Sequence, residues 1–597
     1  MKSFFKLHLI LLIFLFSSFQ NSNAFNPILS KMLQDTLDHY VSIITNIKGM
    51  SASVYYPGQG IWTGTSGVSY SGKPVTSDMK FGIASNSKLF VSTVILKLAE
   101  NNILKLSDSL KKWLPEYPNI SPNITIRQLL NHTSGITDPI FISPYMDTIM
   151  NNPTRIFTPE EVLSWQKVPR YAPGVGYYYS NINYVLAGMI AEKATGFHIS
   201  RLIRDSILTQ LNLDSTFFDI KESILGETAH RWFNGIDYHD TSRVGLNTAG
   251  GCAGSIFSTP TEMVQWYNLL MSGKILNTNS ISEMTKFESP GNYGLGIMRE
   301  KTLGINYWGH AGSTWGYKSK VIYDSCSGAV VCGLSNAFPS GIDGVTFLLY
   351  KILKDNLPTC GGNISGSTLV CQGQNSVIYS IPAIANATSY SWTLPNGATG
   401  TSSSNSITVN YNTSAVSGII SVKGSNSLGE GAASSIPVTV NPKPETPYIS
   451  QNNNVLYSNA ASGNQWYNQN GLIKGATNQS YTATSNGNYF VIVTLSGCSS
   501  DTSNNINVVI NGINETERNI SVNVYPNPVR DFLEINYQQS RILEISILNT
   551  LGEFLFSEDK IQQASNHIID VSNLTTGVYF LKLKYPENTQ VFKIIKE

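Results

Sequence analysis

The sequence has 597 residues and a formal net charge of +1, from 40 basic and 39 acidic side chains. This balance excludes a typical nucleic-acid-binding protein, which carries a clear basic excess, and the length requires several domains instead of one core. Charged residues make up only 13% of the chain and aromatic residues 11%, a composition typical of exported, β-rich proteins.

Residues 1–24 are predicted to be a secretory signal peptide. Lys2 and Lys6 precede an apolar run, and Ser22-Asn23-Ala24 supplies the small residues of a cleavage site. A membrane anchor is the alternative, but the run from Leu7 to Phe16 is too short to span a bilayer comfortably. We therefore expect cleavage after Ala24 and an exported chain without a transmembrane span.

Residues 25–356 combine helical and strand patterns. Strands are predicted at Ser51–Tyr56 and Gly60–Val68, and again between residues 304 and 335 with a turn at 324–328. A closing helix is predicted at Val345–Lys354, and helical patterns fill the middle. This order predicts an α/β (α+β) fold, in which an antiparallel sheet is flanked by helices and carries a helical subdomain. The opening helix has its apolar positions at Leu29, Leu33, Leu37, Val41 and Ile44.

One helix, predicted over residues 85–101, is apolar on nearly every face and is therefore expected to be central. Ser85 stands at its start and Lys88 three residues later, so their side chains share one face. Free N–H groups and the helix dipole favour negative charge there, and burial can lower the pKa of a lysine until it accepts a serine proton. The same Ser-x-x-Lys spacing recurs at Ser77/Lys80, Ser109/Lys112 and Ser164/Lys167, but none of these pairs opens a long apolar helix.

Two further motifs offer groups for the same chemistry. Tyr179-Ser180-Asn181 follows a Pro-Gly turn, and its phenol and amide can carry a proton and hold a carbonyl. His310-Ala311-Gly312 lies between two predicted strands, where the glycine lets the backbone approach a substrate and a neighbouring N–H can serve an oxyanion hole. His132, beside a Thr-Ser-Gly turn, is interpreted as structural.

After Pro358 the composition shifts to Ser, Asn, Gly, Thr and Val, and short strands alternate with turns. Residues 360–441 are predicted to form a PKD- or Ig-like β-sandwich, and residues 444–511 a second Ig-like sandwich with Trp466 on a buried strand. Neither module gathers titratable residues, so both are interpreted as spacers, with cell-wall or glycan contact as the alternative. The strands predicted in the first sandwich are Ser376–Ile381, Ser389–Leu394, Ser406–Tyr411 and Gly418–Val422.

Six cysteines in an exported chain allow disulfides without requiring them. Cys360 and Cys371 flank a short Gly/Ser segment and are one candidate pair, and Cys326 and Cys332, on either side of a predicted turn, are another. Cys252 is expected to be a buried thiol. No Cys/His cluster has the spacing of metal ligands, so we expect neither a metal site nor a cofactor.

Together, Ser-x-x-Lys at Ser85, Tyr-x-Asn at Tyr179 and His-x-Gly at His310 resemble the serine β-lactamase and penicillin-binding-protein superfamily. The resemblance is closest to its class C β-lactamase, D-alanyl-D-alanine carboxypeptidase and esterase branch, with support from residues 124–136, 249–266 and 293–297. It implies a β-lactamase/transpeptidase-like fold for residues 25–356 and a secreted serine hydrolase.

The same resemblance assigns a role to each motif residue. Ser85 is expected to be the acylated nucleophile, Lys88 its base, and Tyr179 the acid and base that serves the leaving group and the attacking water. The backbone N–H groups of Ser85 and Ser313 are expected to form the oxyanion hole. The residues expected to bind substrate are Asn181, His310, Gly312 and Ser313.

The third motif departs from the Lys-Thr-Gly of β-lactamases. A histidine is largely neutral near pH 7 and Ala311 has no hydroxyl, so charge-assisted binding of a carboxylate is weakened. We expect weak or no β-lactamase activity and hydrolysis of an ester, an amide or a D-amino-acid peptide. The alternatives are a true β-lactamase or D-Ala-D-Ala carboxypeptidase and, in another class, a non-catalytic cell-surface binding protein that uses the fold as a scaffold.

Residues 518–597 resemble the C-terminal sorting domain of the Bacteroidetes type IX secretion system. The resemblance rests on a Tyr-Pro-Asn-Pro opening at Tyr525 and a closing Leu-x-x-Gly-x-Tyr-Phe strand at residues 574–580. It implies contact with that secretion machinery, passage through the periplasm and outer membrane, and a location at the cell surface or outside the cell. A third stalk sandwich is the alternative.

Overall fold

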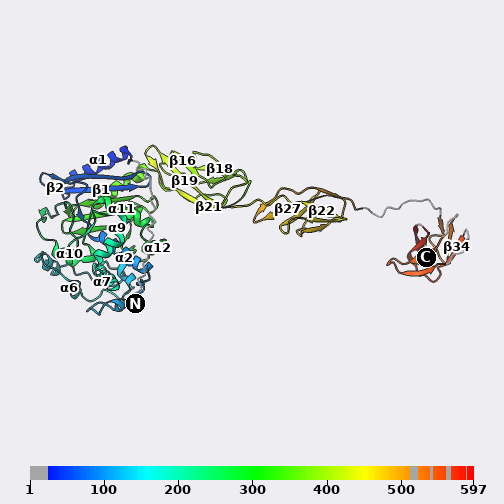
Figure 1. Ribbon diagram of the computed structural model, residues 1–597, viewed down its shortest axis with the longest axis horizontal. Helices are drawn as coiled ribbons and strands as arrows, with labels where there is room; N and C mark the ends of the chain where they lie inside the picture. Colours follow the sequence, from blue (N-terminus) through cyan, green and yellow to red (C-terminus); the bar gives the residue numbers. More distant parts are fainter. Residues whose placement is uncertain (1–23, 141, 511–521, 538–541, 560–565, 587) are drawn as a thin grey trace, which may run out of the picture. The chain divides into compact units, whose positions relative to one another are not determined.

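The computed structural model describes residues 24–140, 142–510, 522–537, 542–559, 566–586 and 588–597 (Figure 1). Nearly all of the predicted signal peptide, residues 1–23, lies outside the described residues. The chain divides into two compact units, one within Met1–Thr446 and Val493–Asp501 and the other within Pro447–Ile492 and Thr502–Glu597. None of the described helices combines the length and the apolar character that crossing a membrane requires.

A seven-stranded antiparallel sheet organises the N-terminal part of the first unit. Its centre pairs an early strand with a late one, because Met50 to Tyr55 lie opposite Val330 to Ser335. The predicted strands and the fold class are therefore confirmed. In spatial order the strands are β3 (Lys73–Pro74), β2 (Gly60–Tyr70), β1 (Gly49–Tyr56), β12 (Val330–Ser335), β11 (Tyr317–Tyr323), β10 (Ile305–Thr314) and β9 (Met298–Thr302).

The sheet separates two apolar cores, because neighbouring residues of a strand face opposite sides. On β11, Ile322 packs with α1 (Pro27–Ile43) and α13 (Ile342–Asn356), whereas Val321 packs with the helices of the other face. Figure 1 shows α1 and α11 (Pro260–Met271) on opposite sides of β1 and β2. The opening and closing helices predicted from the sequence thus cover one face together.

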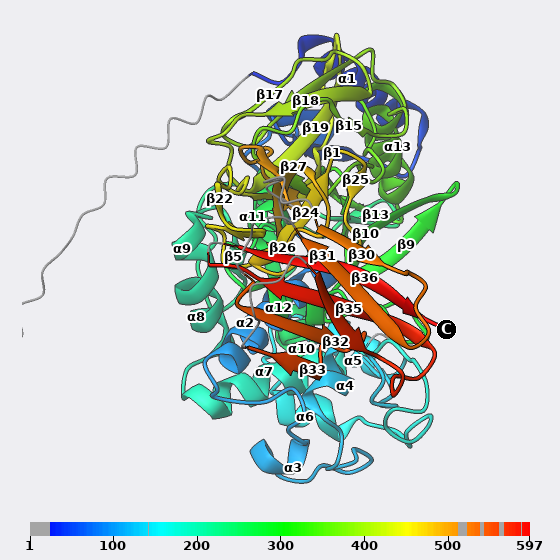
Figure 2. The same ribbon diagram turned by 90° about the vertical axis from the view of Figure 1, so that its right-hand side faces the viewer.

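The helical subdomain is built around α2 (Ser87–Glu100) and α7 (Ile182–Thr195), which contact each other. Figure 2 shows these helices gathered with α4 (Ile126–Leu130) and α6 (Pro159–Ser164), away from α1 and α13. As predicted, α2 is buried on nearly all of its faces. Its start differs from the prediction, because Ala84–Asn86 form a separate 3-10 turn and Ser85 lies in this turn, ahead of the helix.

The first unit continues into a β-sandwich whose two sheets enclose an apolar core that includes Tyr379, Tyr411 and Ile420. One sheet is β14 (Leu369–Cys371), β21 (Ser434–Asn441), β19 (Gly418–Asn426) and β16 (Ser389–Thr393). The other is β15 (Val377–Ser380), β18 (Ser406–Tyr411) and β17 (Ala398–Thr399). All four strands predicted in this module are present.

Both disulfide pairs suggested by the sequence are wrong. The bonds join Cys326 to Cys360 and Cys371 to Cys498. Cys332 cannot meet Cys326, because β12 directs its side chain into the core and leaves it fully buried, whereas Cys326 lies in the turn after β11. Closeness along the chain was therefore a poor guide to pairing.

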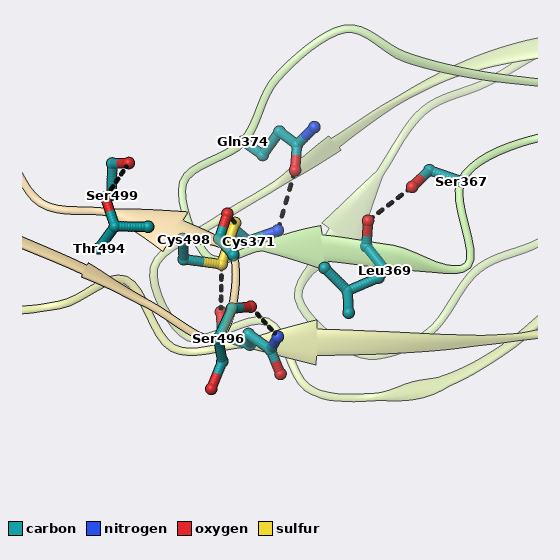
Figure 3. The surroundings of a disulfide bond; sticks show 10 residues. Ser367, Leu369, Cys371, Gln374, Thr494, Ser496, Cys498 and Ser499 are labelled. Carbon is teal, nitrogen blue, oxygen red and sulfur yellow. Dashed lines mark hydrogen bonds between the residues drawn. A yellow bond between two sulfur atoms is a disulfide. The ribbon is translucent and has the colours of Figure 1, made fainter. Parts of the chain in front are cut away.

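The Cys371–Cys498 bond joins the end of β14 to the start of β28 (Cys498–Ser499), 127 residues further along the chain (Figure 3). Beside it, the Asn441 amide donates to the carbonyl of Ser496 at 2.6 Å. Cys252 and Cys332 are the free thiols. The bond closes a long loop, which is the arrangement that restricts an unfolded chain most strongly.

The second unit contains two small β modules. In one, Trp466 on β24 (Asn464–Asn468) is fully buried with Ile449, Tyr489 and Val491, as the sequence predicted. In the other, the core includes Leu581 of β35 (Gly577–Lys584). Its two sheets are β30 (Val522–Tyr525), β31 (Phe532–Tyr537) and β34 (Asn566–Asp570), and β33 (Phe554–Glu558), β32 (Glu544–Leu548), β35 and β36 (Thr589–Lys596).

Candidate active site

The turn that carries Ser85 is held from both sides. Ala84 has a φ of 48°, a left-handed conformation that residues with a side chain rarely adopt. Ser319 on β11 fixes this shape, because its hydroxyl donates to the Ile83 carbonyl at 2.7 Å and accepts from the Asn86 amide at 2.8 Å. The sheet on one side and α2 on the other therefore set the position of the Ser85 hydroxyl.

Gly312 on β10 lets the sheet approach this turn closely. A Cβ atom at this position would lie 2.3 Å from the Ile83 carbonyl oxygen and 2.4 Å from the Ser319 hydroxyl oxygen, closer than real contacts allow. The next residue, Ser313, lines the same pocket as Ser85. Its role as an oxyanion donor stays a prediction.

Lys88 has three acceptors around its amine. Nζ lies 2.9 Å from the Ser85 hydroxyl, 2.8 Å from Asn181 Oδ1 and 2.8 Å from the Ala253 carbonyl. The side chain is completely buried. Burial lowers the pKa of Lys88 to about 7, and the nearby Asp138 carboxylate opposes this fall. A neutral Lys88 keeps two N–H groups for Asn181 and Ala253 and directs its lone pair at Ser85.

Asp138, which the sequence reading missed, orients Asn181. Its Oδ2 atom accepts from Asn181 Nδ2 at 2.7 Å and from the Asn181 backbone N–H at 3.2 Å. A carboxylate can only accept, so it fixes the amide with Nδ2 toward Asp138 and Oδ1 toward Lys88. Burial raises the pKa of Asp138, and the bonds from Asn181 and the charge of Lys88 oppose the rise. The four groups form one chain from the carboxylate to Ser85.

Tyr179 lies over the same amine, with its ring centre 5.0 Å from Lys88 Nζ. Burial raises the pKa of Tyr179 well above its usual value, and interaction with Ser85 opposes this rise. The phenol therefore stays protonated at neutral pH and can donate a proton. His132 supports the segment, because its Nδ1 accepts from the Ser180 N–H at 3.2 Å and its ring packs against Tyr179 with the ring centres 4.2 Å apart.

His310 is buried beneath the site, and both of its ring nitrogens have protein partners. Nε2 lies 2.8 Å from the Tyr293 hydroxyl and Nδ1 lies 2.5 Å from the Ala311 carbonyl. Burial and the charge of Lys88 lower the pKa of His310 to about 3, so the ring is neutral. The expected contact between His310 and substrate stays a prediction and would require one of these bonds to break.

A small pocket of about 20 Å³ opens beside Ser85. This volume holds about one water molecule. None of the described lining residues is charged, and the wall includes Asn181, Leu246, Asn247, Gly254, Ser313 and Thr314. The pocket wall therefore offers no ionic partner to a charged group.

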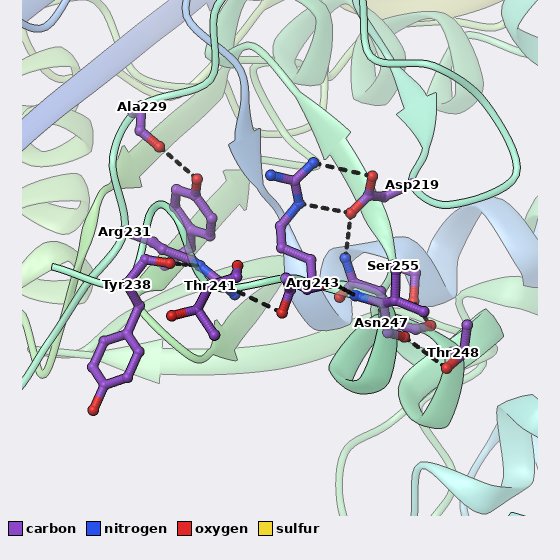
Figure 4. A network of polar contacts seen from close by, with 12 residues as sticks. Asp219, Ala229, Arg231, Tyr238, Thr241, Arg243, Asn247, Thr248 and Ser255 are labelled. Carbon is purple, nitrogen blue, oxygen red and sulfur yellow. Dashed lines mark hydrogen bonds and ion pairs between the residues drawn. The ribbon is translucent and has the colours of Figure 1, made fainter. Parts of the chain in front are cut away.

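Asn247 on the pocket wall is held from behind by an ion pair (Figure 4). Asp219 Oδ2 accepts from the Asn247 amide at 2.5 Å and from Arg243 Nε at 2.9 Å. Ser255 also donates to the Asn247 carbonyl at 2.6 Å. Because Asp219 neutralises Arg243, this cation is not available to a carboxylate in the pocket. The sequence motifs did not identify Asn247 or Asp219 as residues of the site.

The structure thus places Ser85, Asn181 and Ser313 in the wall of one pocket. Lys88 bonds to Ser85 and Asn181, and the Tyr179 ring lies over its amine. Gly312 is the point of close approach, and His310 is buried. Within the part of the chain that the structure describes, no three His, Cys, Asp or Glu side chains come close enough to hold a metal ion. The described groups can transfer a proton from a hydroxyl and bind an uncharged carbonyl compound.

Three family models match the chain. A secretion system C-terminal sorting domain matches residues 523–597 and a PKD-like domain matches residues 357–438. The sorting domain directs the protein to the type IX secretion machinery and to the cell surface or beyond. The third model, the beta-lactamase family, matches residues 33–349. All three resemblances predicted from the sequence are confirmed.

Known proteins with similar sequences match a shorter stretch. Penicillin-binding protein 4* of Bacillus subtilis (strain 168) is 33% identical over 150 residues, which are 24% of this chain and 32% of that protein. Protein flp of Staphylococcus aureus (strain MRSA252) is 34% identical over 143 residues, 23% of this chain and 28% of that protein. The chain therefore spans less than a third of the length of either relative.

Among solved structures, the D-amino acid amidase from Ochrobactrum anthropi SV3 complexed with D-phenylalanine is similar to this chain. The likeness has a TM-score of 0.50 at 25% identity and covers 55% of this chain and 99% of the amidase. Because the family match at residues 33–349 takes in more than half of the 597 residues, the chain belongs to the beta-lactamase family.

Proposed function

We propose that this protein is a secreted serine hydrolase that forms an acyl-enzyme on Ser85. The observation that carries the proposal is the 2.9 Å contact between the Ser85 hydroxyl and the buried Lys88 amine, whose pKa is about 7. About half of such a lysine is neutral at pH 7. The pKa of Tyr179 lies well above its usual value, so Lys88 is the better base for the first step.

In the acylation step, neutral Lys88 takes the Ser85 proton while the hydroxyl oxygen attacks the substrate carbonyl carbon. The negative charge that develops on the carbonyl oxygen is stabilised by the N–H groups of Ser85 and Ser313, and one such donor is worth about 3 to 4 kcal/mol. Collapse of this intermediate breaks the bond to the leaving nitrogen or oxygen. Tyr179 gives that atom a proton and recovers one from Lys88.

In the deacylation step, water attacks the acyl-Ser85 carbonyl and the same groups work in the opposite direction. Tyr179 and Lys88 accept the proton of the water, and the Ser85 oxygen takes a proton as the carboxylic acid leaves. Asn181 keeps Lys88 in place through its 2.8 Å bond and has a second Nδ2 hydrogen left for the substrate carbonyl. Each turnover therefore restores the starting protonation.

The charge of the site favours ester or amide substrates that carry no carboxylate. The neutral, buried His310 and the uncharged pocket wall offer no cation for a carboxylate. The similarity to a D-amino acid amidase supports an amide or peptide of a small D-amino acid, and the pocket of about 20 Å³ supports a small acyl group. A β-lactamase or D-Ala-D-Ala carboxypeptidase remains the alternative activity, and nitrocefin turnover as fast as ester turnover would contradict our substrate class.

The test uses the full chain, p-nitrophenyl acetate, D-alanine p-nitroanilide and a fluorescent penicillin. We expect turnover of the ester or the anilide and a covalent mass gain, both lost in Ser85→Ala. Ser109→Ala is the matched control, because Ser109 has the same spacing to Lys112 but lies outside the site. Turnover that survives Ser85→Ala would refute the mechanism. A folded native protein without labelling or turnover would favour the binding-protein alternative.

The remaining modules are proposed to serve secretion and spacing. We propose residues 1–24 as a signal peptide, 518–597 as the sorting domain, and 360–441 and 444–511 as spacers between it and the hydrolase domain at 25–356. Binding of a 360–511 deletion variant to cell-wall and glycan preparations should equal that of the full chain. Weaker binding by the deletion variant would assign the sandwiches a targeting role.

A further inference from the structure

A second cavity, of about 240 Å³, lies in the helical subdomain next to the catalytic pocket. The two share Asn247 in their walls, but none of Ser85, Lys88 and Tyr179 lines the second one. An apolar protein cavity of about 150 Å³ is large enough to bind benzene. The second cavity can therefore hold a larger, benzyl-sized group. Its apolar wall is formed by Phe157, Val185, Met189, Ile199, Phe218 and Ile220.

The wall is built from fixed elements. Val185, Met189 and Glu192 follow one another at i, i+4 and i+7 on α7, so they share a face of that helix. The Phe157 N–H donates to Thr248 Oγ1 at 3.0 Å, which fixes the opposite segment. Ile220 has a φ of 75°, a conformation that a β-branched residue almost never adopts without a surrounding structure that imposes it. Strained residues of this kind are concentrated at ligand sites.

The rim of the cavity carries one anion and one cation. Glu192 Oε1 accepts from the Ile199 N–H at 3.1 Å and lies 3.4 Å from His198 Nε2. Lys221 is exposed and has no carboxylate partner among the described residues. His198 lines the cavity together with both charged residues. Burial lowers the pKa of His198, Glu192 raises it, and Lys221 lowers it further. His198 is therefore neutral between two opposite charges.

The other acidic group of the cavity, Asp219, is already matched. Asp219 accepts from Arg243 at 2.9 Å and from Asn247 at 2.5 Å, so it contributes no free charge to a ligand. Glu192 and Lys221 are then the groups that select the ligand. A carboxylate alone would pair with Lys221 but face Glu192, and an amine alone would pair with Glu192 but face Lys221.

We propose that this cavity binds an apolar α-amino acid in its zwitterionic form. Its ammonium group faces Glu192, its carboxylate faces Lys221, and its side chain occupies the apolar wall. The ligand would touch the wall that holds Asn247, so its site adjoins the catalytic pocket without using the catalytic residues. The proposal does not depend on the hydrolase activity, because binding is measured directly.

The first experiment is calorimetric titration of the full-length Ser85→Ala protein, which cannot form an acyl-enzyme. The probes are phenylalanine as either enantiomer, 3-phenylpropionate, 2-phenylethylamine and glycine. We expect at least one enantiomer of phenylalanine to bind at least about tenfold more tightly than each of the other three, because only it satisfies both charges and the apolar wall. Equal binding of the acid, the amine and phenylalanine would overturn the proposal, as would no binding of phenylalanine.

Variants then locate the site. Lys221→Gln should weaken phenylalanine about three- to fivefold but not 2-phenylethylamine, which loses a repelling charge. Glu192→Gln should weaken phenylalanine by a similar factor but not 3-phenylpropionate, for the same reason. Lys274→Gln, an exposed lysine outside the cavity, is the matched control. Met189→Trp should fill the cavity and abolish binding. If that variant fails to fold, the two charge variants decide, and unchanged phenylalanine binding in both would overturn the proposal.

Discussion

Replacing Asp138 by asparagine tests how the site sets the protonation of Lys88. Asn181 stands between the two charges, accepting from Lys88 Nζ at 2.8 Å and donating to Asp138 Oδ2 at 2.7 Å. With the width of one amide group added, the charges are roughly 7 Å apart, where an effective dielectric constant of about 20 gives an attraction of about 2 kcal/mol. The carboxylate therefore stabilises protonated Lys88 and opposes the effect of burial.

In Asp138→Asn this attraction is lost, so the pKa of Lys88 falls below about 7. A change of one pKa unit corresponds to about 1.4 kcal/mol, and partial screening leaves an expected decrease of about 1 pH unit in the acidic midpoint of kcat/KM. The midpoint moves to lower pH because the base is the neutral amine, and a lysine with a lower pKa stays neutral at lower pH. The plateau rate should also fall, because the new amide can turn its nitrogen toward Asn181 and release the orientation of that side chain.

The assay is kcat/KM for p-nitrophenyl acetate between about pH 5 and about pH 9, which reports the pKa of the free enzyme's base. Asp147→Asn is the matched control, because it removes one acidic charge from the exposed helix α5 (Tyr145–Met150) and should leave the midpoint unchanged. An unchanged midpoint in folded Asp138→Asn, or a midpoint that moves to higher pH, would refute the electrostatic coupling between Asp138 and Lys88.

Three further changes test other parts of the structure. Tyr179→Phe removes the proton donor and should lower kcat about 10² to 10⁴-fold, with the mass of any accumulated acyl-enzyme as the readout; a rate near that of the native protein would contradict the role. Leu246→Ala widens the pocket of about 20 Å³ and should raise the butyrate-to-acetate ratio of ester turnover about tenfold or more, whereas an unchanged ratio would show that Leu246 does not limit acyl size. Joint Cys371→Ser and Cys498→Ser opens a loop with a sequence separation of 127 and should cost about 2 to 4 kcal/mol, seen as a lower Tm without reductant; an unchanged Tm would show that this bond does not stabilise the sandwiches.

The parts of the fold that sequence predicted well depend on local patterns. The apolar spacing in residues 29–44 gives α1, and alternation around residues 304–335 gives β10, β11 and β12, because one face of each element is buried. Ser85 was identified because it precedes a helix buried on nearly all faces. Its exact position differed, since the 3-10 turn is imposed by Ser319 from a strand more than two hundred residues away.

The parts that sequence could not predict depend on contacts across the fold. Asp138 has no distinctive spacing, and its role appears only when α7 places Asn181 against it. The partner of Cys371 is 127 residues away, so no local rule could choose it over Cys360. For His310, the ordinary pKa of histidine predicted a neutral ring. It predicted neither the burial that lowers the pKa to about 3 nor the Tyr293 hydroxyl that contacts Nε2.

The identity of residue 310 links substrate choice to the strength of the base. A cation at this position would bind a carboxylate of the substrate. It would also lie close to Lys88, whose charge already lowers the pKa of His310. Like charges disfavour one another, so a permanent cation would lower the pKa of Lys88 beyond the effect of burial. With a neutral histidine there, burial and the opposing Asp138 carboxylate leave the pKa of Lys88 at about 7. In the proposed mechanism, the site therefore keeps a base matched to neutral pH and lacks an attraction for anionic substrates.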